Sequence, residues 1–443
     1  MLEDIKKERI QKRDNFIEAG YDVYPSHIPD SCPIECILKR FFFLKLFCRK
    51  VSVKGRIMGL RNQGGIIFAD IKDETGNIQI VILKKLIKDF NLFRDNLDIG
   101  DFIYAEGKAF NTKAGQKSVK ATDILIIEKS LLPLPSVWHG LKDVEERYRK
   151  RYLDLILNKE IKEKIISRSK IVEGIRGMLS CQGFIEVETP ILQPLSGGAT
   201  AKPFKTHHNA LDTDFYLRIA PELYLKRLLV GGMEKVFEIG RSFRNEGIDR
   251  DHNPEFTTLE LYWAYQDYKG LMEFVRNLLG CWIPGNWKTI TFSDLIKKSS
   301  DEIRKMKTEK LDALYKEERG KITEPTFVIE YPETIMPLAK YKKEDNTFTE
   351  SFQLIANGAE LMKGFSEMND PKAQREQMER QEKEFRGGNE EASRLDEDFL
   401  EALEYGMPPA AGLGIGIDRL SAYITKSNSL KEIIIFPTLK PKN

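Results

Sequence analysis

The clearest pattern in the chain is a pair of alternating hydrophobic and polar segments within residues 235–267, joined by the polar turn NEGIDRDHNP. Alternation with a period of two is typical of half-buried strands, and a polar turn between two such strands indicates a hairpin. In the first segment Phe237, Ile239 and Phe243 share one face, and Arg244 takes the other face. The pattern therefore predicts a hairpin with a functional arginine near its turn.

The second segment of this hairpin also has two different faces. Phe256, Glu260 and Tyr262 are predicted to point toward the surface that Arg244 shares. The opposite, mostly apolar face is formed by Thr257, Leu259, Leu261 and Trp263. An arginine, a carboxylate and two aromatic rings on one face can hold an anion, a planar base and a cation together. A solvated hairpin with scattered charges is the alternative interpretation.

Five short strand-like runs follow one another between residues 51 and 129, with glycine-containing turns and one helical insert at about residues 84–97. This pattern predicts a five-stranded β-barrel of the OB type over residues 51–135, preceded by a helical extension at 1–50. Such barrels bind single-stranded nucleic acid through aromatic and basic side chains. Phe68 and Arg61 have suitable side chains, although an aromatic residue in a barrel strand can also be part of the core.

Residues 136–158 combine a proline-rich stretch with a basic run and are predicted to be a linker that enters a helix. Beyond them, helical and strand patterns mix over residues 159–443, beginning with a long helix at about 159–182. The segment GFIEVETPIL then alternates like a strand that ends at Pro190. Later, GLGIGIDRL passes from a glycine-interrupted strand directly into a helix. We expect a second, larger domain of sheet and helices here.

Composition narrows the class of protein. The chain has 443 residues, of which 41% are hydrophobic and 31% charged, and no apolar run approaches the length of a membrane span. Its N-terminus is charged from the third residue and lacks the apolar core of a signal peptide, so we expect a cytoplasmic protein. The five cysteines have no paired CxxC spacing, which argues against a disulfide framework or a zinc ribbon.

The net charge of +2 conceals an uneven distribution along the chain. Between Cys36 and Ala69 there is no Asp or Glu, whereas the balance reverses around residues 384–404. This basic block consists of Lys39, Arg40, Lys45, Arg49, Lys50, Lys54, Arg56 and Arg61. The N-terminal part could therefore contact a polyanion, and a solvated basic face is the alternative.

Three motifs occur in order along the chain: GFIEVETPIL, then FRNEG followed by HNPEFTTLELY, and finally GLGIGIDRL. Together they resemble the signature motifs of the class II aminoacyl-tRNA synthetases. The N-terminal OB-fold is similar to that of the subgroup that charges aspartate, asparagine and lysine. RIAPELYLKRLLVGG and GFSEMND resemble the lysyl-tRNA synthetases in particular. No HIGH or KMSKS string of the unrelated class I enzymes occurs.

The resemblance implies a multidomain α+β fold. An N-terminal five-stranded barrel would bind the anticodon, and a C-terminal antiparallel β-sheet flanked by helices would form the catalytic domain. It also implies a homodimer formed through the first motif, and a reduced helical insertion at about residues 290–350. The implied activity is ATP-dependent ligation of L-lysine to tRNA(Lys) through a lysyl-adenylate, with release of pyrophosphate and AMP. A paralogue that lysylates a protein and a catalytically silent RNA-binding relative are the alternatives.

By similarity to the family, Arg244 bridges the substrate carboxylate and the α-phosphate, and a guanidinium suits that forked contact. Phe256 would stack under the adenine with Arg419 over its other face. Arg244 and Arg419 are the expected catalytic residues. The expected ATP-binding set is Arg244, Glu246, His252, Asn253, Phe256, Glu360, Gly414, Gly416 and Arg419. For the glycines, simple packing of strand or helix is the alternative.

The resemblance also implies a lysine-binding set, because an ammonium held away from water requires a compensating anion. Glu367 and Tyr262 would face the side-chain ammonium, and Glu222 and Glu260 the amino-group end. The full set is Gly198, Glu222, Arg244, Glu260, Tyr262, Lys363, Phe365 and Glu367. Taken alone, each glutamate would more often be a surface residue than a ligand.

Two positions depart from the family pattern. Mg²⁺ bridging the phosphates is expected, but where the family often has two glutamates seven residues apart this chain has Gln353 and Glu360. A neutral amide contributes no charge, which makes Glu360 the stronger candidate ligand. Lys363 stands where asparagine is common. It could attract the substrate carboxylate or repel the substrate ammonium, and we favour attraction.

In the N-terminal domain, the family resemblance assigns anticodon contacts to Arg61, Phe68 and Gln79. Splayed bases would stack on Phe68 and form hydrogen bonds with the two polar side chains. Gln116 occupies a nearby loop position where glutamate is expected. The predicted anticodon-binding set is therefore Arg61, Phe68, Gln79 and Gln116.

Overall fold

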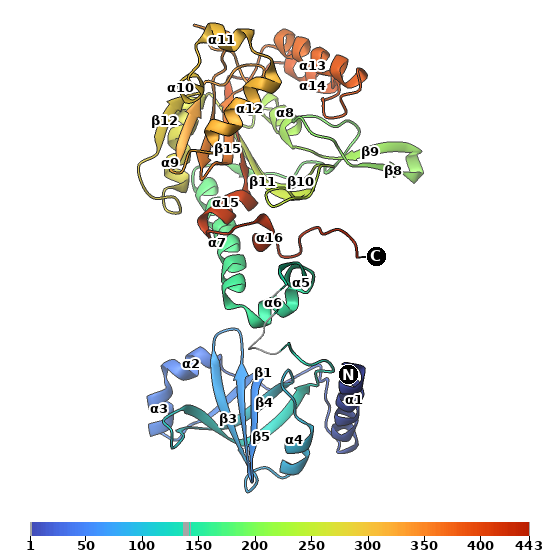
Figure 1. Ribbon diagram of the computed structural model, residues 1–443, viewed down its shortest axis with the longest axis vertical. Coiled ribbons are helices and arrows are strands. Elements are labelled where there is room, and N and C mark those ends of the chain that lie inside the picture. The colour runs from blue at the N-terminus through green and yellow to red at the C-terminus, as the bar shows by residue number, and fades with distance from the viewer. Residues whose placement is uncertain (1, 136–140, 142, 443) are drawn as a thin grey trace. The chain divides into compact units, whose positions relative to one another are not determined.

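The computed structural model describes residues 2–135, 141 and 143–442, which form two compact units, 1–142 and 143–443. Figure 1 labels the helices and strands of both units. Part of the predicted linker, residues 136–140 and 142, lies outside the described residues. Residues 143–158 of that segment belong to the second unit and contain helices α5 (Val144–Arg149) and α6 (Arg151–Leu157).

Five strands of the first unit close into a ring in the order β1-β2-β3-β5-β4. The strands are β1 (Lys50–Gln63), β2 (Ile66–Lys72), β3 (Asn77–Leu83), β4 (Phe102–Asn111) and β5 (Lys117–Glu128). Ile67, Ala69 and Ile71 of β2 point into the core, as alternation along a strand requires. The OB-fold predicted from the sequence is confirmed. The predicted insert contains one helix, α4 (Phe90–Asn96).

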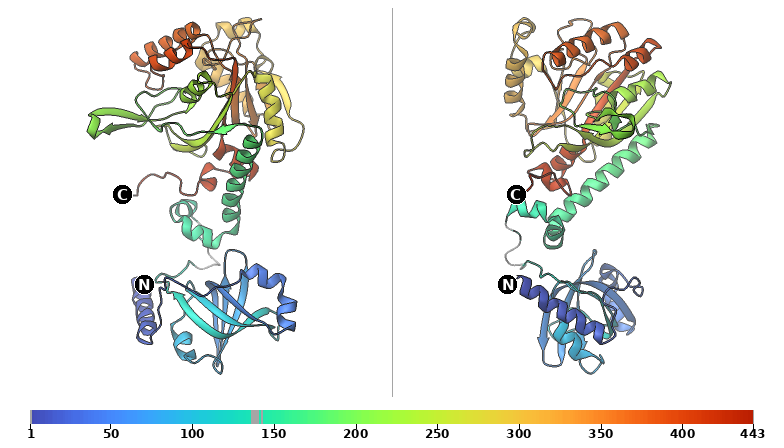
Figure 2. Two further views of the ribbon diagram at one scale, coloured as in Figure 1. Left: turned by 180° about the vertical axis from the view of Figure 1, so that it is seen from behind. Right: turned by 90° about the vertical axis from the view of Figure 1, so that its right-hand side faces the viewer.

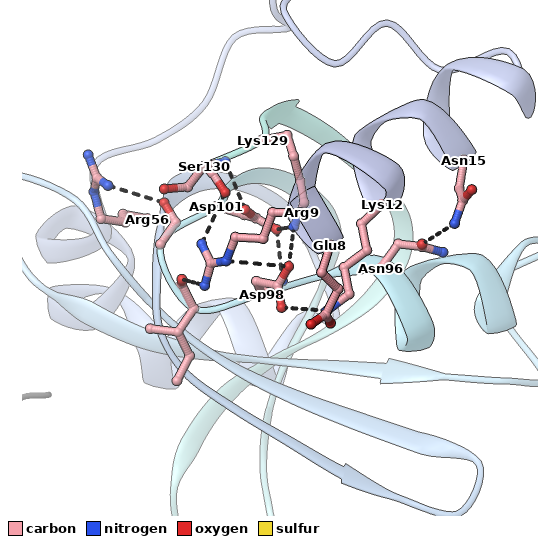
Figure 3. A network of polar contacts seen from close by, with 12 residues as sticks. Glu8, Arg9, Lys12, Asn15, Arg56, Asn96, Asp98, Asp101, Lys129 and Ser130 are labelled. Atoms are coloured by element: carbon pink, nitrogen blue, oxygen red, sulfur yellow. Dashed lines mark hydrogen bonds and ion pairs between the residues drawn. The ribbon is translucent and has the colours of Figure 1, made fainter. Parts of the chain in front are cut away.

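The N-terminal extension contains α1 (Leu2–Glu18), α2 (Ile34–Lys39) and α3 (Phe41–Leu46). In Figure 1, α1 runs along one side of the ring and α2 and α3 lie along the opposite side. Figure 3 shows how α1 is attached by polar contacts, since Lys12 Nζ lies 2.9 Å from Asp98 Oδ1. Lys129 is fully buried beside Asp98 and lies 2.7 Å from Asp101. The helical extension is therefore part of the N-terminal unit.

An eight-stranded sheet forms the centre of the second unit, in the order β12-β13-β14-β15-β16-β11-β10-β6. Its strands are β12 (Lys288–Thr291), β13 (Thr326–Ile329), β14 (Ser351–Ala356), β15 (Ala359–Ser366), β16 (Ala410–Gly416), β11 (Glu255–Ala264), β10 (Lys235–Phe243) and β6 (Ile185–Glu186). The central pairs are antiparallel, as expected, whereas the edge pairs β12–β13 and β10–β6 are parallel.

The strand predicted for GFIEVETPIL is much shorter than the alternation suggested. Only the two residues of β6 join the large sheet, and β7 (Leu192–Gln193) pairs with a separate sheet. That three-stranded sheet is completed by β8 (Lys205–His208) and β9 (Thr213–Leu217), with the 3-10 helix η1 (Asn209–Leu211) between them. Between β6 and β7 the chain turns from one sheet to the other, which ends the strand before Pro190.

Helices cover the two faces of the large sheet unequally (Figures 1 and 2). On one face α7 (Lys159–Cys181), α9 (Tyr268–Leu279) and α15 (Ile417–Ile424) pack on the continuous core that contains Leu259 and Leu261. The other face is covered in two separate patches. The first consists of α8 (Glu222–Val230), α13 (Pro371–Arg386) and α14 (Glu397–Glu404), and the second of α10 (Phe292–Ile296), α11 (Ser300–Lys305) and α12 (Thr308–Arg319). The part of this sheet face between the two patches is not covered by these helices.

The last helix, α16 (Leu430–Ile433), and the residues directly after it contribute carbonyl groups that hold the start of the unit. The guanidinium of Arg151 is fully buried, donates to the carbonyl of Ile435 at 3.0 Å and pairs with Asp154 at 2.6 Å. The segment after the predicted linker is therefore anchored to the C-terminal part of the chain. Among the described residues, no helix combines the length and the apolar character needed to span a bilayer.

Candidate active site

The hairpin predicted at residues 235–267 is formed by β10 and β11 in antiparallel register, with Phe237 opposite Leu261 and Ser242 opposite Phe256. Phe237 and Leu261 have no exposed surface and lie in the main core. The alternate residues of β11 point the other way, toward the uncovered part of the sheet. The two-faced character read from the sequence is therefore present in the structure.

A cavity of about 160 Å³ opens on this uncovered face. Its walls come from β11, β15, β16, the first turn of α15 and the turn between β10 and β11. All nine predicted ATP-binding residues line it: Arg244, Glu246, His252, Asn253, Phe256, Glu360, Gly414, Gly416 and Arg419. The fold thus brings together residues that lie more than 170 positions apart in the chain.

The cations that line the cavity are not held in ion pairs within the described part of the chain, although carboxylates line it as well. Arg244 lies with its guanidinium carbon 5.1 Å from the centroid of the Phe256 ring, and its buried Nε donates no hydrogen bond. Burial lowers the pKa of Arg244 despite the nearby Glu246, and the neighbouring Arg419 lowers it further. Within the described residues, Arg244, Arg419 and Lys363 form no ion pair. This arrangement favours an anionic ligand.

The position of Arg419 is fixed by its neighbour Asp418. One oxygen of the buried Asp418 carboxylate accepts from the backbone N–H of Thr257 at 2.8 Å, and the other accepts from Arg168 at 2.9 Å. These bonds tie the start of α15 to β11 and to α7. The following side chain, Arg419, therefore points into the cavity from a helix N-terminus, where an anion compensates the unfavourable position of a cation.

The polar turn of the hairpin is ordered by its own side chains. Asn253 Nδ2 donates to the carbonyl of Glu255 at 2.6 Å, and its Oδ1 accepts from the N–H of Thr438 at 3.1 Å. His252 Nδ1 lies 2.8 Å from a carboxylate oxygen of Asp249. These contacts keep the turn at the cavity wall and link it to the C-terminal segment.

A second cluster, formed by ionisable residues, extends from the cavity under the helices. Lys226 Nζ lies 2.6 Å from a carboxylate oxygen of Glu222 and 2.6 Å from one of Glu367, and all three side chains are buried. Glu260 connects this cluster to the cavity, because it lines the cavity and accepts from the hydroxyl of Tyr262 at 3.3 Å. Phe365 completes the surroundings, with Lys226 Nζ 5.9 Å from its ring centroid.

The charges in this cluster do not balance. Burial, reinforced by the charge of Glu222, raises the pKa of Glu260 to about 8, although Lys363 opposes the shift. Burial also raises the pKa of Glu367. Burial by itself would lower the pKa of Lys226, but the carboxylates of Glu222 and Glu367 outweigh this effect and raise it above its ordinary value. Neither oxygen of Glu367 accepts a well-formed hydrogen bond. Three carboxylates around one ammonium favour a further cation.

Two glycines make room for this cluster. Gly198 has a φ of 83°, which a side chain rarely adopts, and a Cβ there would lie 3.0 Å from Cβ of Glu222. At Gly412 a Cβ would meet the Glu367 carboxylate and lie 2.6 Å from Cε1 of Tyr262. The close approach of Glu222 to Gly198, and of Glu367 and Tyr262 to Gly412, therefore requires glycine at both positions.

The predicted metal ligands occupy different environments. Glu360 lines the cavity, whereas Gln353 is buried in β14, where its carbonyl oxygen accepts from Tyr315 at 2.6 Å and from Tyr331 at 3.1 Å. In the part of the chain that the structure describes, no three His, Cys, Asp or Glu side chains gather as a metal site. The residues present fit an ion held by Glu360 together with ligand phosphates, without Gln353.

The predicted anticodon residues lie on the N-terminal unit. Phe68 is half-buried on the outer side of β2, not in the core, with the Arg61 guanidinium carbon 6.0 Å from its ring centroid. Gln79 is only 2% exposed and is held by Asp70 and Ser118, whereas Gln116 is exposed in the turn between β4 and β5. Arg61, Phe68 and Gln116 are therefore accessible, and Gln79 is fixed within the sheet.

Two family models match the chain. One, described as tRNA synthetases class II (D, K and N), covers residues 143–440, and the other, an OB-fold nucleic acid binding domain, covers residues 51–127. The chain belongs to the class II tRNA synthetases. The two matches correspond to the cavity-bearing unit and to the closed ring of strands, respectively.

Relatives that align over most of the chain show to which group of class II synthetases it belongs. It is 44% identical to the lysine–tRNA ligase of Moorella thermoacetica, over 99% of this chain and 98% of the relative. It is 46% identical to the ligase of the same name from Thermoanaerobacter pseudethanolicus, over 89% of this chain and 87% of the relative. The chain is thus a member of the lysine–tRNA ligase family, with both domains of its relatives.

Sequence reasoning about this synthetase missed Lys226 and Asp418. Lys226 follows Glu222 by one helical turn within an otherwise apolar stretch, and this spacing is a signal for an ion pair. Asp418 directly precedes Arg419, but its bonds to Thr257 and Arg168 join segments that are distant in sequence. Only the role of Lys226 could have been predicted from the local sequence.

Proposed function

We propose that this synthetase activates L-lysine with ATP and transfers the lysyl group to tRNA(Lys), releasing pyrophosphate and AMP. The observation that carries the proposal is the pairing of two unbalanced charge sites on one sheet face. Unpaired cations line the cavity, and an excess of buried carboxylates lies next to it. A substrate with a carboxylate at one end and ammonium groups elsewhere complements both sites, and ATP supplies the remaining anion.

At the nucleotide end, Arg244 is proposed to contact the α-phosphate and the substrate carboxylate. Its contact with the Phe256 ring leaves the fork of the guanidinium free for oxygen ligands. Arg419, from the opposite wall, would cover the adenine that stacks on Phe256. Gly414 and Gly416 leave the strand backbone accessible to the nucleotide, since both line the cavity without side chains.

At the lysine end, the carboxylates of Glu260, Glu222 and Glu367 are proposed to hold the ammonium groups. Lys226 neutralises only part of their charge. The remaining carboxylate charge would compensate a bound ammonium for the hydration that it loses on burial. Lys363 lines the cavity on the side of Glu260. We propose that it attracts the substrate carboxylate toward Arg244, which separates the two ends of the substrate.

The proposed chemistry needs no general base, because the attacking carboxylate is ionised at neutral pH. The chain has to bring two anions together and stabilise the negative charge of the pentavalent transition state. We propose that Arg244 does both. A Mg²⁺ ion bound with the triphosphate would reduce phosphate charge and fix its geometry, and Glu360 is the residue proposed to hold it.

A homodimer and a cytoplasmic location form part of the proposal. The segment between β6 and β7 belongs to the first motif and exposes Ile185, Ile191 and Leu192 by 53%, 43% and 48%. Exposed apolar residues close together in sequence favour an interface with a second copy. A tRNA substrate is met where translation takes place, and we propose the cytoplasm.

The deciding experiment is amino-acid-dependent exchange of pyrophosphate into ATP, measured separately with each of the twenty amino acids. We expect exchange with lysine alone, followed by lysine transfer to a tRNA(Lys) transcript. Exchange driven by aspartate or asparagine, or absent with every amino acid, would contradict the proposal. Exchange with lysine but transfer only to a protein acceptor would support the paralogue alternative instead.

A further inference from the structure

The N-terminal unit carries an exposed cluster of aromatic and basic side chains around α3 that the proposed contacts do not use. Phe42, Phe43 and Phe47 are 70%, 62% and 65% exposed, which is unusual for large apolar residues. Phe41, by contrast, is buried in the core of the ring and anchors the helix. We call the exposed residues the α3 patch: Arg40, Phe42, Phe43, Lys45, Phe47 and Arg49.

The cations of the α3 patch are not neutralised. Within the described residues, Arg40, Lys45 and Arg49 make no ion pair, although all three are exposed. The flanking lysines differ, because Lys39 pairs with Glu35 at 2.8 Å and Lys50 pairs with Glu106 at 2.6 Å. Free cations between exposed rings match the combination with which proteins bind unpaired nucleic-acid strands.

The patch adjoins the predicted anticodon surface. The buried ring of Phe41 lies under the ammonium of Lys117, with Nζ 5.5 Å from the ring centroid. Lys117 follows Gln116 directly, and α3 also packs along β4, the other strand of the same turn. The exposed side of α3 therefore lies beside the turn that carries Gln116.

From this turn a chain of hydrogen bonds leads to the remaining anticodon residues. Ser118 donates to Gln79 Oε1 at 3.1 Å, and Gln79 Nε2 donates to Asp70 at 3.1 Å. The second oxygen of Asp70 lies 3.7 Å from the guanidinium of Arg61. The turn beside the α3 patch and the pair formed by Arg61 and Phe68 are thus linked through side chains of one closed sheet, of which Gln79 and Ser118 are buried.

We propose that the α3 patch is a second RNA-binding surface, which contacts the tRNA strand beyond the anticodon bases. The rings of Phe42, Phe43 and Phe47 would stack on unpaired bases or riboses, and the three cations would neutralise phosphates. The proposal rests on the proposed function, since that function supplies the tRNA. A symmetric contact between two such patches is disfavoured because it would place like charges opposite one another.

The test compares two double variants of the full chain. The first, Phe43→Ser/Lys45→Glu, changes the patch. The matched control, Ile17→Ser/Lys7→Glu, replaces one exposed apolar and one exposed basic residue of α1, along the opposite side of the ring (Figure 1). Binding of a tRNA(Lys) transcript and of its isolated anticodon stem-loop is measured over a range of salt concentrations, and lysine-dependent pyrophosphate exchange serves as the check on folding.

We expect the patch variant to bind the tRNA at least about 10-fold more weakly, with a salt dependence reduced by about one counterion or more, and the control to bind within about twofold of the unchanged protein. Exchange should be unchanged in both variants. Equal tRNA binding by patch variant and control would overturn the proposal. A patch variant that binds tRNA normally but loses its dimeric state, or loses binding to phosphatidylserine vesicles, would assign the patch to a second copy or to a membrane instead.

The two proposals can fail separately. If the unchanged protein exchanges pyrophosphate with lysine but binds no tRNA, the α3 proposal is overturned and amino-acid activation stands. If tRNA binding depends on the patch but exchange does not depend on lysine, the RNA surface is supported and the substrate assignment is wrong.

Discussion

The guanidinium of Arg244 lies over the ring of Phe256, with its central carbon 5.1 Å from the ring centroid and its Nε without a hydrogen-bond acceptor. The two residues come from opposite ends of one polar turn, so the hairpin holds a cation and an aromatic ring side by side. An arginine that is oriented by packing but not neutralised by a carboxylate is available to a phosphate without prior rearrangement.

Replacement of this arginine is the first prediction. Arg244→Ala removes the proposed contact to the transition state, and we expect lysine-dependent exchange to fall by at least about 100-fold. Arg241→Ala is the matched control, because Arg241 lies on the same strand and pairs with Glu255 at 3.4 Å outside the cavity. Near-normal exchange by Arg244→Ala, with the fold unchanged by circular dichroism, would show that the hairpin has another role.

The second prediction concerns pH. The pKa of Glu260 is raised to about 8 in the free protein, mainly by burial, so the group is largely protonated at neutral pH. Binding of an ammonium favours the ionised form, and lysine binding at pH 7 should therefore release about one proton. Affinity should rise as the pH increases toward about 8. Calorimetry in two buffers of different ionisation enthalpy measures the released protons, and Glu260→Gln should reduce their number, with Glu367, whose pKa burial also raises, as the remaining source.

The same carboxyl predicts the stability of the free protein. A carboxyl group with a raised pKa in the folded state binds more protons folded than unfolded between its ordinary value, 4.5, and about 8. Its contribution to the free energy of unfolding therefore decreases as the pH rises through that window. We expect the melting temperature to decrease between about pH 6 and pH 8, and lysine to restore it. A melting temperature that is independent of both would contradict this reading of the cluster.

The third prediction concerns the space beside Glu367. A Cβ at Gly412 would lie 2.6 Å from Tyr262 Cε1 and against the Glu367 carboxylate, so Gly412→Ala must displace one of the two side chains. We expect lysine affinity to fall at least about 10-fold. At Gly414 the nearest atom to a Cβ is Glu260 Cγ at 3.9 Å, and Gly414→Ala should raise the KM for ATP more than that for lysine. If Gly412→Ala affected ATP more than lysine, and Gly414→Ala affected lysine more than ATP, the proposed positions of the two substrates would be wrong.

The fourth prediction separates the two units. Phe68→Ala removes an accessible ring from the predicted anticodon surface, and base stacking on an aromatic ring contributes about 1–3 kcal/mol. We expect kcat/KM for tRNA(Lys) to decrease by about 10-fold, with lysine-dependent exchange unchanged. An equal decrease in both reactions would mean that Phe68 acts through folding and not through the anticodon.

Local pattern was sufficient to predict most elements of the fold. The hairpin of β10 and β11, the five strands of the ring and the long helix α7 follow from periodicity, because neighbouring residues decide which face is apolar. The strand predicted for GFIEVETPIL was longer than β6, the strand that the structure contains there. There the alternation is real, but the chain leaves one sheet for another after two residues, and no local rule specifies that change.

The sequence by itself determined the family motifs and the hairpin with Arg244 and Phe256, because each of these resides in a short contiguous segment. The set of residues expected at the nucleotide came from the family resemblance, and the fold brings that set together in one cavity. The tertiary structure decided how charge is balanced. Only the folded chain places Lys226 between Glu222 and Glu367 and surrounds Gln353 with two tyrosines. Burial and electrostatic balance depend on which distant segments meet, and this information is not contained in the spacing of residues along any one of them.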